Sequence, residues 1–164
     1  MNLDSIYQKL QIQEMNQMQK STFTTTENNT DTILLSPTGS GKTLAFLFPV
    51  VRDLQPDYSG VQTLILVPAR ELALQVEQVF KKMGTDFKVN VCYGGHDKKI
   101  EINNFIQPPS VLIGTPGRVA YHIKNNNFDP TKVQTLVLDE FDKALELGFE
   151  EDMDYIISSL DQLQ

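Results

Sequence analysis

The sequence is poor in the residues that disulfide-bonded, zinc-binding or membrane-spanning proteins need. It has 164 residues and a single cysteine, Cys92, which excludes an internal disulfide and a multi-cysteine zinc site. Its two histidines, His96 and His122, argue against a histidine-rich metal site. The longest apolar run, Leu44 to Val51, has eight residues, whereas a membrane-spanning helix needs about 20. Residues 1–10 show no basic residue before an apolar stretch, so we expect no signal peptide and a cytoplasmic location.

Basic residues are also scarce. The chain has 14 lysines and arginines against 21 acidic residues, a net charge of −7, which taken whole argues against a nucleic-acid binder. The acidity is concentrated at one end: Asp139 to Gln164 holds nine acids and one base, and the preceding residues hold 12 acids and 13 bases. The net charge alone therefore does not indicate a binding partner. Hydrophobic residues make up 40% of the chain, enough for a core.

Short apolar segments alternate with helical patterns along the chain. The predicted strands are Thr32–Leu35, Thr63–Val67, Lys88–Tyr93, Val111–Gly114 and Thr135–Leu138. They are apolar on both faces, as buried parallel strands are. Helical patterns are expected at Leu72–Phe80, at Lys98–Phe105, from about Gly117, and at Glu150–Leu160. This alternation predicts an α/β fold, a three-layer α/β/α sandwich with a mainly parallel sheet, in which ligands bind at the carboxyl ends of the strands.

A glycine-rich turn, Ser36-Pro37-Thr38-Gly39-Ser40-Gly41-Lys42-Thr43, follows the first predicted strand and precedes a helical stretch. Its glycines allow the backbone to wrap around a phosphate, and the new helix offers its positive N-terminal end. Lys42 would reach the outer phosphates, and the Thr43 hydroxyl would hold Mg²⁺. The general pattern begins with glycine, and Ser36 stands in that place. A plain turn before a helix is the alternative. We predict nucleotide binding by Thr38, Gly39, Ser40, Gly41, Lys42 and Thr43.

Two acidic residues, Asp139 and Glu140, end the last predicted strand. Carboxylates at the end of an apolar strand are costly unless they face a cation or water. Asp139 would hold Mg²⁺, partly through water, and Glu140 would orient the attacking water. Taken alone, the segment is equally compatible with an acidic turn that opens a helix. Together with the phosphate loop it predicts hydrolysis, with Lys42, Asp139 and Glu140 as the catalytic residues.

Several motifs, in this order along the chain, resemble those of the DEAD-box RNA helicases, specifically their N-terminal, ATP-binding lobe. The segments that carry the resemblance are Ser36–Thr43, Pro68–Ala73, Gly94–Gly95, Thr115–Arg118 and Asp139–Asp142. Ala69 stands where threonine is usual, and Phe141 where alanine is usual. The resemblance implies a RecA-like P-loop NTPase fold. It also implies that residues 1–164 form one domain, a fragment of a longer protein whose second RecA-like domain is absent.

The resemblance also implies which residues contact RNA. In the family, the three middle motifs contact the RNA backbone without reading its bases. Arg70 and Arg118 would then pair with phosphates, while the Thr115 hydroxyl and nearby backbone amides would donate further hydrogen bonds. For both arginines, an exposed side chain at the start of a helix is the alternative. The implied RNA-binding residues are Pro68, Arg70, Gly94, Gly95, Thr115, Pro116, Gly117 and Arg118. Asp142 would couple the ATP state to RNA contact.

The segment that reads adenine in the family departs most from the family pattern. Gln11–Ile12 and Met15–Asn16 replace the usual Gly-aromatic and Pro-Thr pairs. Gln19 lies at the usual distance before the phosphate loop, and its amide has the donor and the acceptor that an adenine edge needs. Gln13 and Gln17 are competing candidates, and an exposed glutamine on a polar helix is the further alternative.

Taken as a whole, the resemblance implies an ATP-dependent RNA helicase with ATP and Mg²⁺ as cofactors. Hydrolysis would be coupled to RNA binding and local duplex unwinding, with RNA and the second RecA-like domain as partners and no membrane. The sequence stops before the arginine fingers of that second domain, which are worth about 10³ to 10⁵ in rate. We therefore expect little activity from the isolated chain. Two alternatives remain: a non-catalytic nucleotide-binding interaction module, and a related P-loop ATPase acting on DNA.

Overall fold

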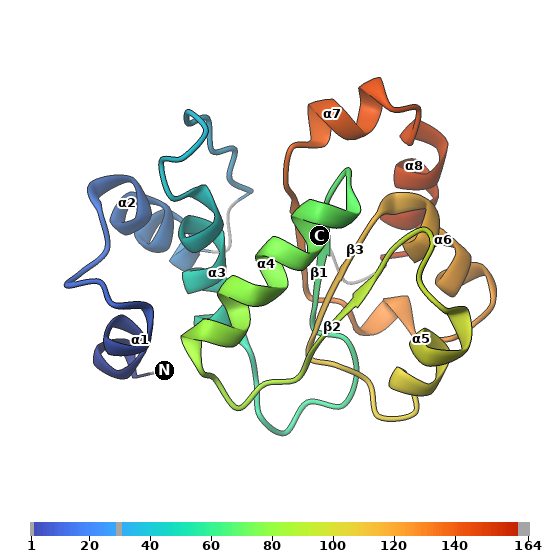
Figure 1. Cartoon of the computed structure of the whole chain (residues 1–164), viewed down its shortest axis with the longest axis horizontal. Coiled ribbons are helices and arrows are strands. Elements are labelled where there is room, and N and C mark those ends of the chain that lie inside the picture. The colour runs from blue at the N-terminus through green and yellow to red at the C-terminus, as the bar shows by residue number, and fades with distance from the viewer. Residues whose placement is uncertain (1, 29–30, 161–164) are drawn as a thin grey trace. The chain divides into compact units, whose positions relative to one another are not determined.

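The computed structural model describes residues 2–28 and 31–160 (Figure 1). The helices are α1 (Leu3–Leu10), α2 (Gln17–Thr25), α3 (Lys42–Asp53), α4 (Arg70–Met83), α5 (Lys98–Asn104), α6 (Pro116–Lys124), α7 (Phe141–Glu146) and α8 (Glu150–Ser158). The strands are β1 (Thr63–Leu66), β2 (Val89–Cys92), β3 (Val111–Gly114) and β4 (Thr135–Leu138). Two 3₁₀ turns, η1 (Thr26–Asn28) and η2 (Pro130–Lys132), complete the described elements. None of these helices has the length and apolar character needed to cross a bilayer.

The chain divides into two compact units. The first contains the residues up to Leu54 together with Gln78–Asp86. The second contains Gln55–Glu77 and the residues from Phe87 onward. The glycine-rich turn lies in the first unit, and the other four motif segments lie in the second.

Helices α2 and α3 pack together in the first unit. The side chain of Asn16 caps α2 by accepting from the Gln19 amide at 2.9 Å, which satisfies a backbone donor that the helix itself cannot. Arg52 on α3 joins the two helices, since its guanidinium donates to the Phe23 carbonyl oxygen at 2.6 Å and lies 4.8 Å from the centroid of that ring. The glycine-rich turn follows α2 and leads into α3.

The second unit is built on a parallel sheet with strand order β2-β3-β1-β4. Leu64 and Ile65 of β1 point to opposite faces of the sheet, and both are fully buried. The sheet is therefore covered on both sides, as the near-continuous apolar sequence of its central strands requires. The α/β class with a parallel sheet is confirmed, and four of the predicted strand segments form β1 to β4.

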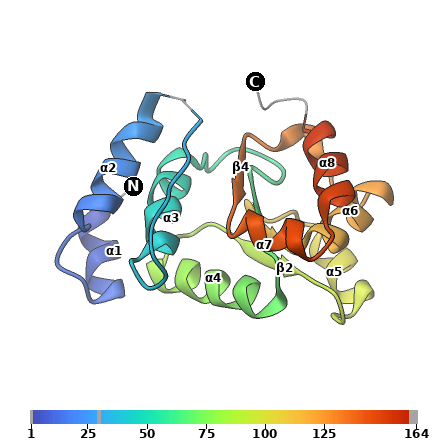
Figure 2. The same ribbon diagram turned by 90° about the horizontal axis from the view of Figure 1, so that it is seen from above.

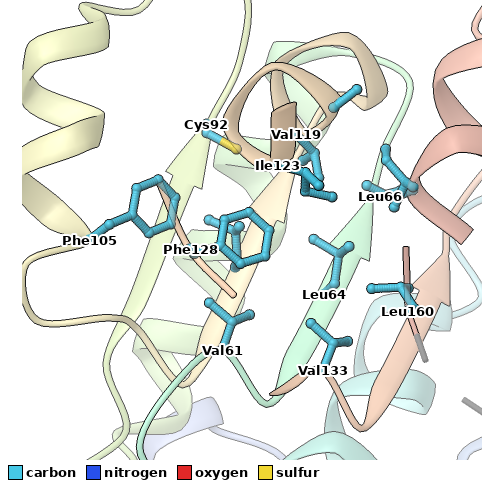
Figure 3. Close-up of a cluster of buried hydrophobic side chains, with 13 residues drawn as sticks. Val61, Leu64, Leu66, Cys92, Phe105, Val119, Ile123, Phe128, Val133 and Leu160 are labelled. Carbon is cyan, nitrogen blue, oxygen red and sulfur yellow. The ribbon is translucent and has the colours of Figure 1, made fainter. Parts of the chain in front are cut away.

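One face of this sheet carries the hydrophobic core of the second unit (Figure 3). Leu64 and Leu66 of β1 contribute to it together with Val119 and Ile123 of α6. Helix α8 packs beside α6, as Figure 2 shows. Cys92 belongs to the same core, and burial, reinforced by the negative charge of a nearby carboxylate, raises the pKa of its thiol. Cys92 is thus a packed, protonated side chain, which agrees with its position in an apolar strand.

The prediction of a strand at Thr32–Leu35, the first of the five predicted strands, is wrong. Residues 31–37 form no strand, and the side chains of Ile33 and Leu35 are 85% and 89% exposed. Strand prediction from an apolar run assumes that the run will be buried, and these two side chains are not. The glycine-rich turn therefore follows an extended segment rather than a sheet strand.

Candidate functional site

The glycine-rich turn contains two glycines with positive φ angles. Gly39 and Gly41 adopt φ angles of +79° and +91°, a left-handed conformation that favours glycine. Helix α3 begins directly after them at Lys42, so its unpaired amides open onto the turn. Ser36, which replaces the usual first glycine, forms a short hydrogen bond with Ser40 across the loop. The loop is thus closed by its own side chains.

Gln19 connects α2 to this loop. Its side-chain oxygen accepts from the Asn16 amide at 2.9 Å, and its side-chain nitrogen donates to the Gly41 carbonyl oxygen at 3.2 Å. Asn16 reinforces the connection, because its side-chain nitrogen donates to the Ser40 carbonyl oxygen at 3.1 Å. Gln19 is buried, and its amide retains one N–H for another acceptor. Asn16 occupies a position where the family pattern was absent, so the sequence did not indicate this contact.

The contact between Gln19 and Gly41 predicts different costs for alanine at the two loop glycines. A Cβ at Gly41 would lie 2.7 Å from the Gln19 side-chain nitrogen, whereas a Cβ at Gly39 would meet nothing within 4 Å. Gly39→Ala carries only the backbone strain, about 1 kcal/mol of unfolding free energy, while Gly41→Ala adds a clash and should cost about 2 kcal/mol or more. Urea denaturation of the two variants measures the difference. Equal losses would show that the Gln19 contact does not constrain the loop.

Three predicted RNA-binding segments meet at one edge of the sheet. Pro68 and Arg70 follow β1, Gly94 follows β2, and Thr115 follows β3. Because the strands are parallel, these carboxyl ends lie on the same side. The segments line a cavity of about 540 Å³, and six of the eight predicted residues contribute to its wall, namely Pro68, Arg70, Gly94, Thr115, Gly117 and Arg118. Gly95 and Pro116 do not line it. We call this cavity the strand-end groove.

The fourth strand, β4, ends in the predicted catalytic acids. The Asp139 amide donates to the Leu66 carbonyl oxygen at 3.0 Å, which continues the β4 pairing by one residue. Glu140 then adopts φ 50° and ψ 44°, a conformation that non-glycine residues rarely take and that costs of order 1 kcal/mol. Its side chain is exposed, and α7 begins immediately after it. Phe141 is also half exposed, so the larger side chain in place of alanine is not buried in a core.

Comparison with known proteins covers the part of the chain that holds these segments. The family model described as DEAD/DEAH box helicase matches residues 16–164. The chain belongs to this family. It is 37% identical over 147 residues to the ATP-dependent RNA helicase CshA of Limosilactobacillus reuteri, covering 88% of this chain and 30% of that protein. It is 38% identical over 136 residues to the ATP-dependent RNA helicase DeaD of Escherichia coli K12, covering 81% and 22% of the respective chains.

A solved structure gives the same result for the fold. A crystal structure described as a hypothetical ATP-dependent RNA helicase from Sulfolobus tokodaii aligns with a TM-score of 0.86 and 27% identity, covering 99% of this chain and 48% of that one. The RecA-like α/β fold expected from the resemblance is confirmed. The chain spans less than a third of the length of the two curated relatives.

Arg118, the last residue of the family's Thr-Pro-Gly-Arg motif, is held by the protein itself. Its Nε donates to the Tyr93 carbonyl oxygen at 3.1 Å, and a terminal nitrogen donates to the His96 carbonyl oxygen at 2.8 Å. The Glu101 carboxylate lies 3.4 Å from Nε. Arg118 is buried, in contrast to the exposed arginine of the alternative interpretation. It therefore joins the start of α6 to the double-glycine turn.

Glu101 on α5 organises this part of the groove wall. The carboxylate is 1% exposed and accepts from the Tyr93 amide at 3.2 Å, while one oxygen lies 2.9 Å from His96 Nδ1 and the other 2.7 Å from His122 Nε2. Burial acts to raise the pKa of Glu101. The hydrogen bonds from the two imidazoles and the backbone amide, with the Arg118 guanidinium, outweigh burial and hold that pKa below its ordinary value.

We call Glu101, His96, His122 and Arg118 the Glu101 cluster. The sequence did not indicate this cluster. His96 contacts the buried Glu101 carboxylate. His122 is fully buried, and its other nitrogen lies 2.9 Å from the Asn127 side-chain amide. With that amide donating, His122 Nε2 carries the proton that it donates to Glu101. Glu101 lies on a short polar helix, and nothing in the neighbouring sequence indicates that its side chain is buried.

Proposed function

We propose that this chain is the ATP- and RNA-binding lobe of an ATP-dependent RNA helicase. The observation that carries the proposal is the convergence of the segments at Pro68–Arg70, Gly94 and Thr115–Arg118 on one groove. Names of relatives such as CshA and DeaD, both called ATP-dependent RNA helicases, support the same activity. Hydrolysis of ATP to ADP and phosphate, coupled to local duplex unwinding, is part of the proposal.

The nucleotide side of the proposal rests on the glycine-rich turn. In this proposal, its amides and Lys42 hold the phosphates, Gln19 contacts the adenine, and Glu140 orients the attacking water. The remaining N–H of the Gln19 amide and the open space over Gly39 support these roles.

Mg²⁺ is the metal that fits the donor set. In this proposal the Thr43 hydroxyl and the Asp139 carboxylate would supply oxygen ligands, which Mg²⁺ prefers, and this ion commonly takes one or two protein ligands together with phosphates and water. Among residues 2–28 and 31–160, no cluster of three or more histidine, cysteine, aspartate or glutamate side chains is arranged to hold a metal. This set of side chains suits an ion that binds together with a nucleotide better than a metal that the protein holds by itself. When bound, Mg²⁺ would neutralise phosphate charge.

RNA is the proposed ligand of the strand-end groove. Its wall offers the Thr115 hydroxyl, glycine backbone and the exposed Arg70, whose guanidinium carbon lies 5.2 Å from the Tyr93 ring centroid. Such groups bind phosphates and sugars and do not distinguish bases. Local cations at the strand ends can bind RNA although the chain as a whole is acidic.

Binding of single-stranded RNA tests this function. A short fluorescent oligouridylate should bind the chain more tightly than the DNA strand of the same sequence, and Arg70→Ala should weaken RNA binding about three- to tenfold by removing a phosphate contact. Lys82→Ala, at the other end of α4 and outside the groove, is the matched control and should bind as the wild type does. Fluorescence anisotropy measures both. Equal RNA and DNA affinities would favour the DNA-dependent ATPase, and ATP binding without RNA binding would favour the interaction module.

We propose that residues 1–164 act as a single domain with a second RecA-like domain as partner, that Asp142 couples the two ligands, and that the isolated chain hydrolyses ATP poorly. A cytoplasmic location belongs to the same proposal, supported by a lone cysteine that is buried and unpaired.

A further inference from the structure

The strand-end groove has three cationic side chains in its wall, and they are not equally available to a ligand. Arg118 is buried and binds two carbonyl oxygens and the Glu101 carboxylate. Arg70 and Lys98 are exposed. Lys98 is therefore the second exposed cation of the groove. It lies outside all of the family motifs found in the sequence.

Lys98 is the first residue of α5, and an aromatic side chain fixes its direction. Its Nζ lies 4.2 Å from the ring centroid of Tyr121 on α6, and Tyr121 also lines the groove. The Arg118 guanidinium carbon lies 5.8 Å from the same ring. A cation within about 6 Å of an aromatic face is attracted by the ring's quadrupole. Tyr121 therefore keeps the flexible lysine beside the groove instead of leaving it free in solvent.

The carboxylates near Lys98 have other partners. Asp97 caps α5 by accepting from the Lys99 amide at 2.8 Å. Asp152, next to Gly117, lies 4.0 Å from Lys124 Nζ. Glu101 is enclosed by His96, His122 and Arg118. Within the described residues Lys98 forms no ion pair, so its charge is not neutralised by the protein.

We propose that Lys98 is a phosphate-binding residue of the strand-end groove, and that Tyr121 is the positioning residue that holds it there. The ligand is the sugar-phosphate backbone of single-stranded RNA, so this inference rests on the proposed function. Lys98 extends the contact surface from the motif residues toward α5. The contact is electrostatic and independent of base sequence.

The salt dependence of RNA binding tests the role of Lys98. Each phosphate contact to a single strand contributes about 0.7 to the slope of log affinity against log salt concentration. Lys98→Ala should therefore lower that slope by about 0.7 and weaken binding of a short oligouridylate about three- to tenfold at low salt. Lys99→Ala removes an equal charge from the neighbouring position of α5, outside the groove wall, and should leave the slope unchanged. Amide NMR titration of the labelled chain measures weak affinities and shows that each variant is folded.

A double-mutant cycle tests the role of Tyr121. Tyr121→Ala should weaken binding when Lys98 is present and have little further effect in Lys98→Ala, whereas Tyr121→Phe should keep the wild-type affinity. Independent, additive losses would contradict the positioning role. If Lys98→Ala kept the wild-type salt slope and RNA affinity while Arg70→Ala still bound RNA more weakly, the role of Lys98 would be wrong and the proposed function would stand. If oligouridylate causes no saturable shifts in the wild-type spectrum, the proposed function fails with it.

Discussion

Replacing Lys42 by alanine should lower the affinity of the chain for ATP by about 100-fold or more. Lys42 is the only cation in the Ser36–Thr43 loop and stands at the first position of α3. Removing one partner from a desolvated charge pair costs about 2–5 kcal/mol, much of it because the other charge is left unpaired. Titration with a fluorescent ATP analogue measures the loss.

Glu140→Gln is the matched control for that prediction. It changes a side chain assigned to the attacking water and not to the phosphates, so ATP affinity should stay within a few-fold of the wild type. In single-turnover assays with the chain in excess, the slow hydrolysis of the wild type should disappear in this variant. If Lys42→Ala bound ATP normally, the loop would not be the nucleotide site. If Glu140→Gln hydrolysed ATP at the wild-type rate, Glu140 would not be the residue that orients water.

Replacing Glu101 by alanine should destabilise the chain by about 3–5 kcal/mol, the range found when one partner of a buried ion pair is removed. The substitution leaves the buried Arg118 guanidinium without its carboxylate and removes the acceptor for His96 and His122. Urea denaturation measures the loss. Glu146→Ala, which removes an exposed carboxylate paired with Lys143, is the control and should change the free energy of unfolding far less.

Acid should weaken the same cluster. The folded-state pKa of Glu101 lies below its ordinary value of 4.5. Its contribution to stability is therefore complete above about pH 4.5 and is lost as the pH falls through the lower folded-state pKa. Glu101→Gln cannot ionise, so its unfolding free energy should depend less on pH in that window. An unchanged pH profile in Glu101→Gln would show that the carboxylate is not held in its charged form by the groove wall.

The sheet could be predicted because the residues of each strand indicate a buried strand by themselves. Segments such as Thr63–Leu66 and Val111–Gly114 are apolar on both faces and become strands buried on both faces. Thr32–Leu35 has a similar composition and forms no strand, because an apolar run does not specify whether a neighbour will cover it. The short helix α1 was not predicted, since it has eight residues and depends on local capping and packing rather than on a long periodic pattern.

The spacing of motifs along the sequence indicated candidate site residues, but it could not indicate how side chains pack around them. Gly39 and Gly41 were expected to let the backbone turn tightly, and both adopt positive φ angles. The partner of Arg118 could not be anticipated, because Glu101 lies on a different helix and meets it only through the fold. For the same reason nothing local distinguished Lys98 from Lys99, although only Lys98 faces Tyr121 in the groove.

A crystal structure of this chain with single-stranded RNA tests the central claim most directly. We expect the phosphates to cross the strand-end groove, with contacts to Arg70, the Thr115 hydroxyl and Lys98, and with Arg118 still bound to Glu101. RNA bound on another surface, with none of its phosphates in the groove, would contradict the account.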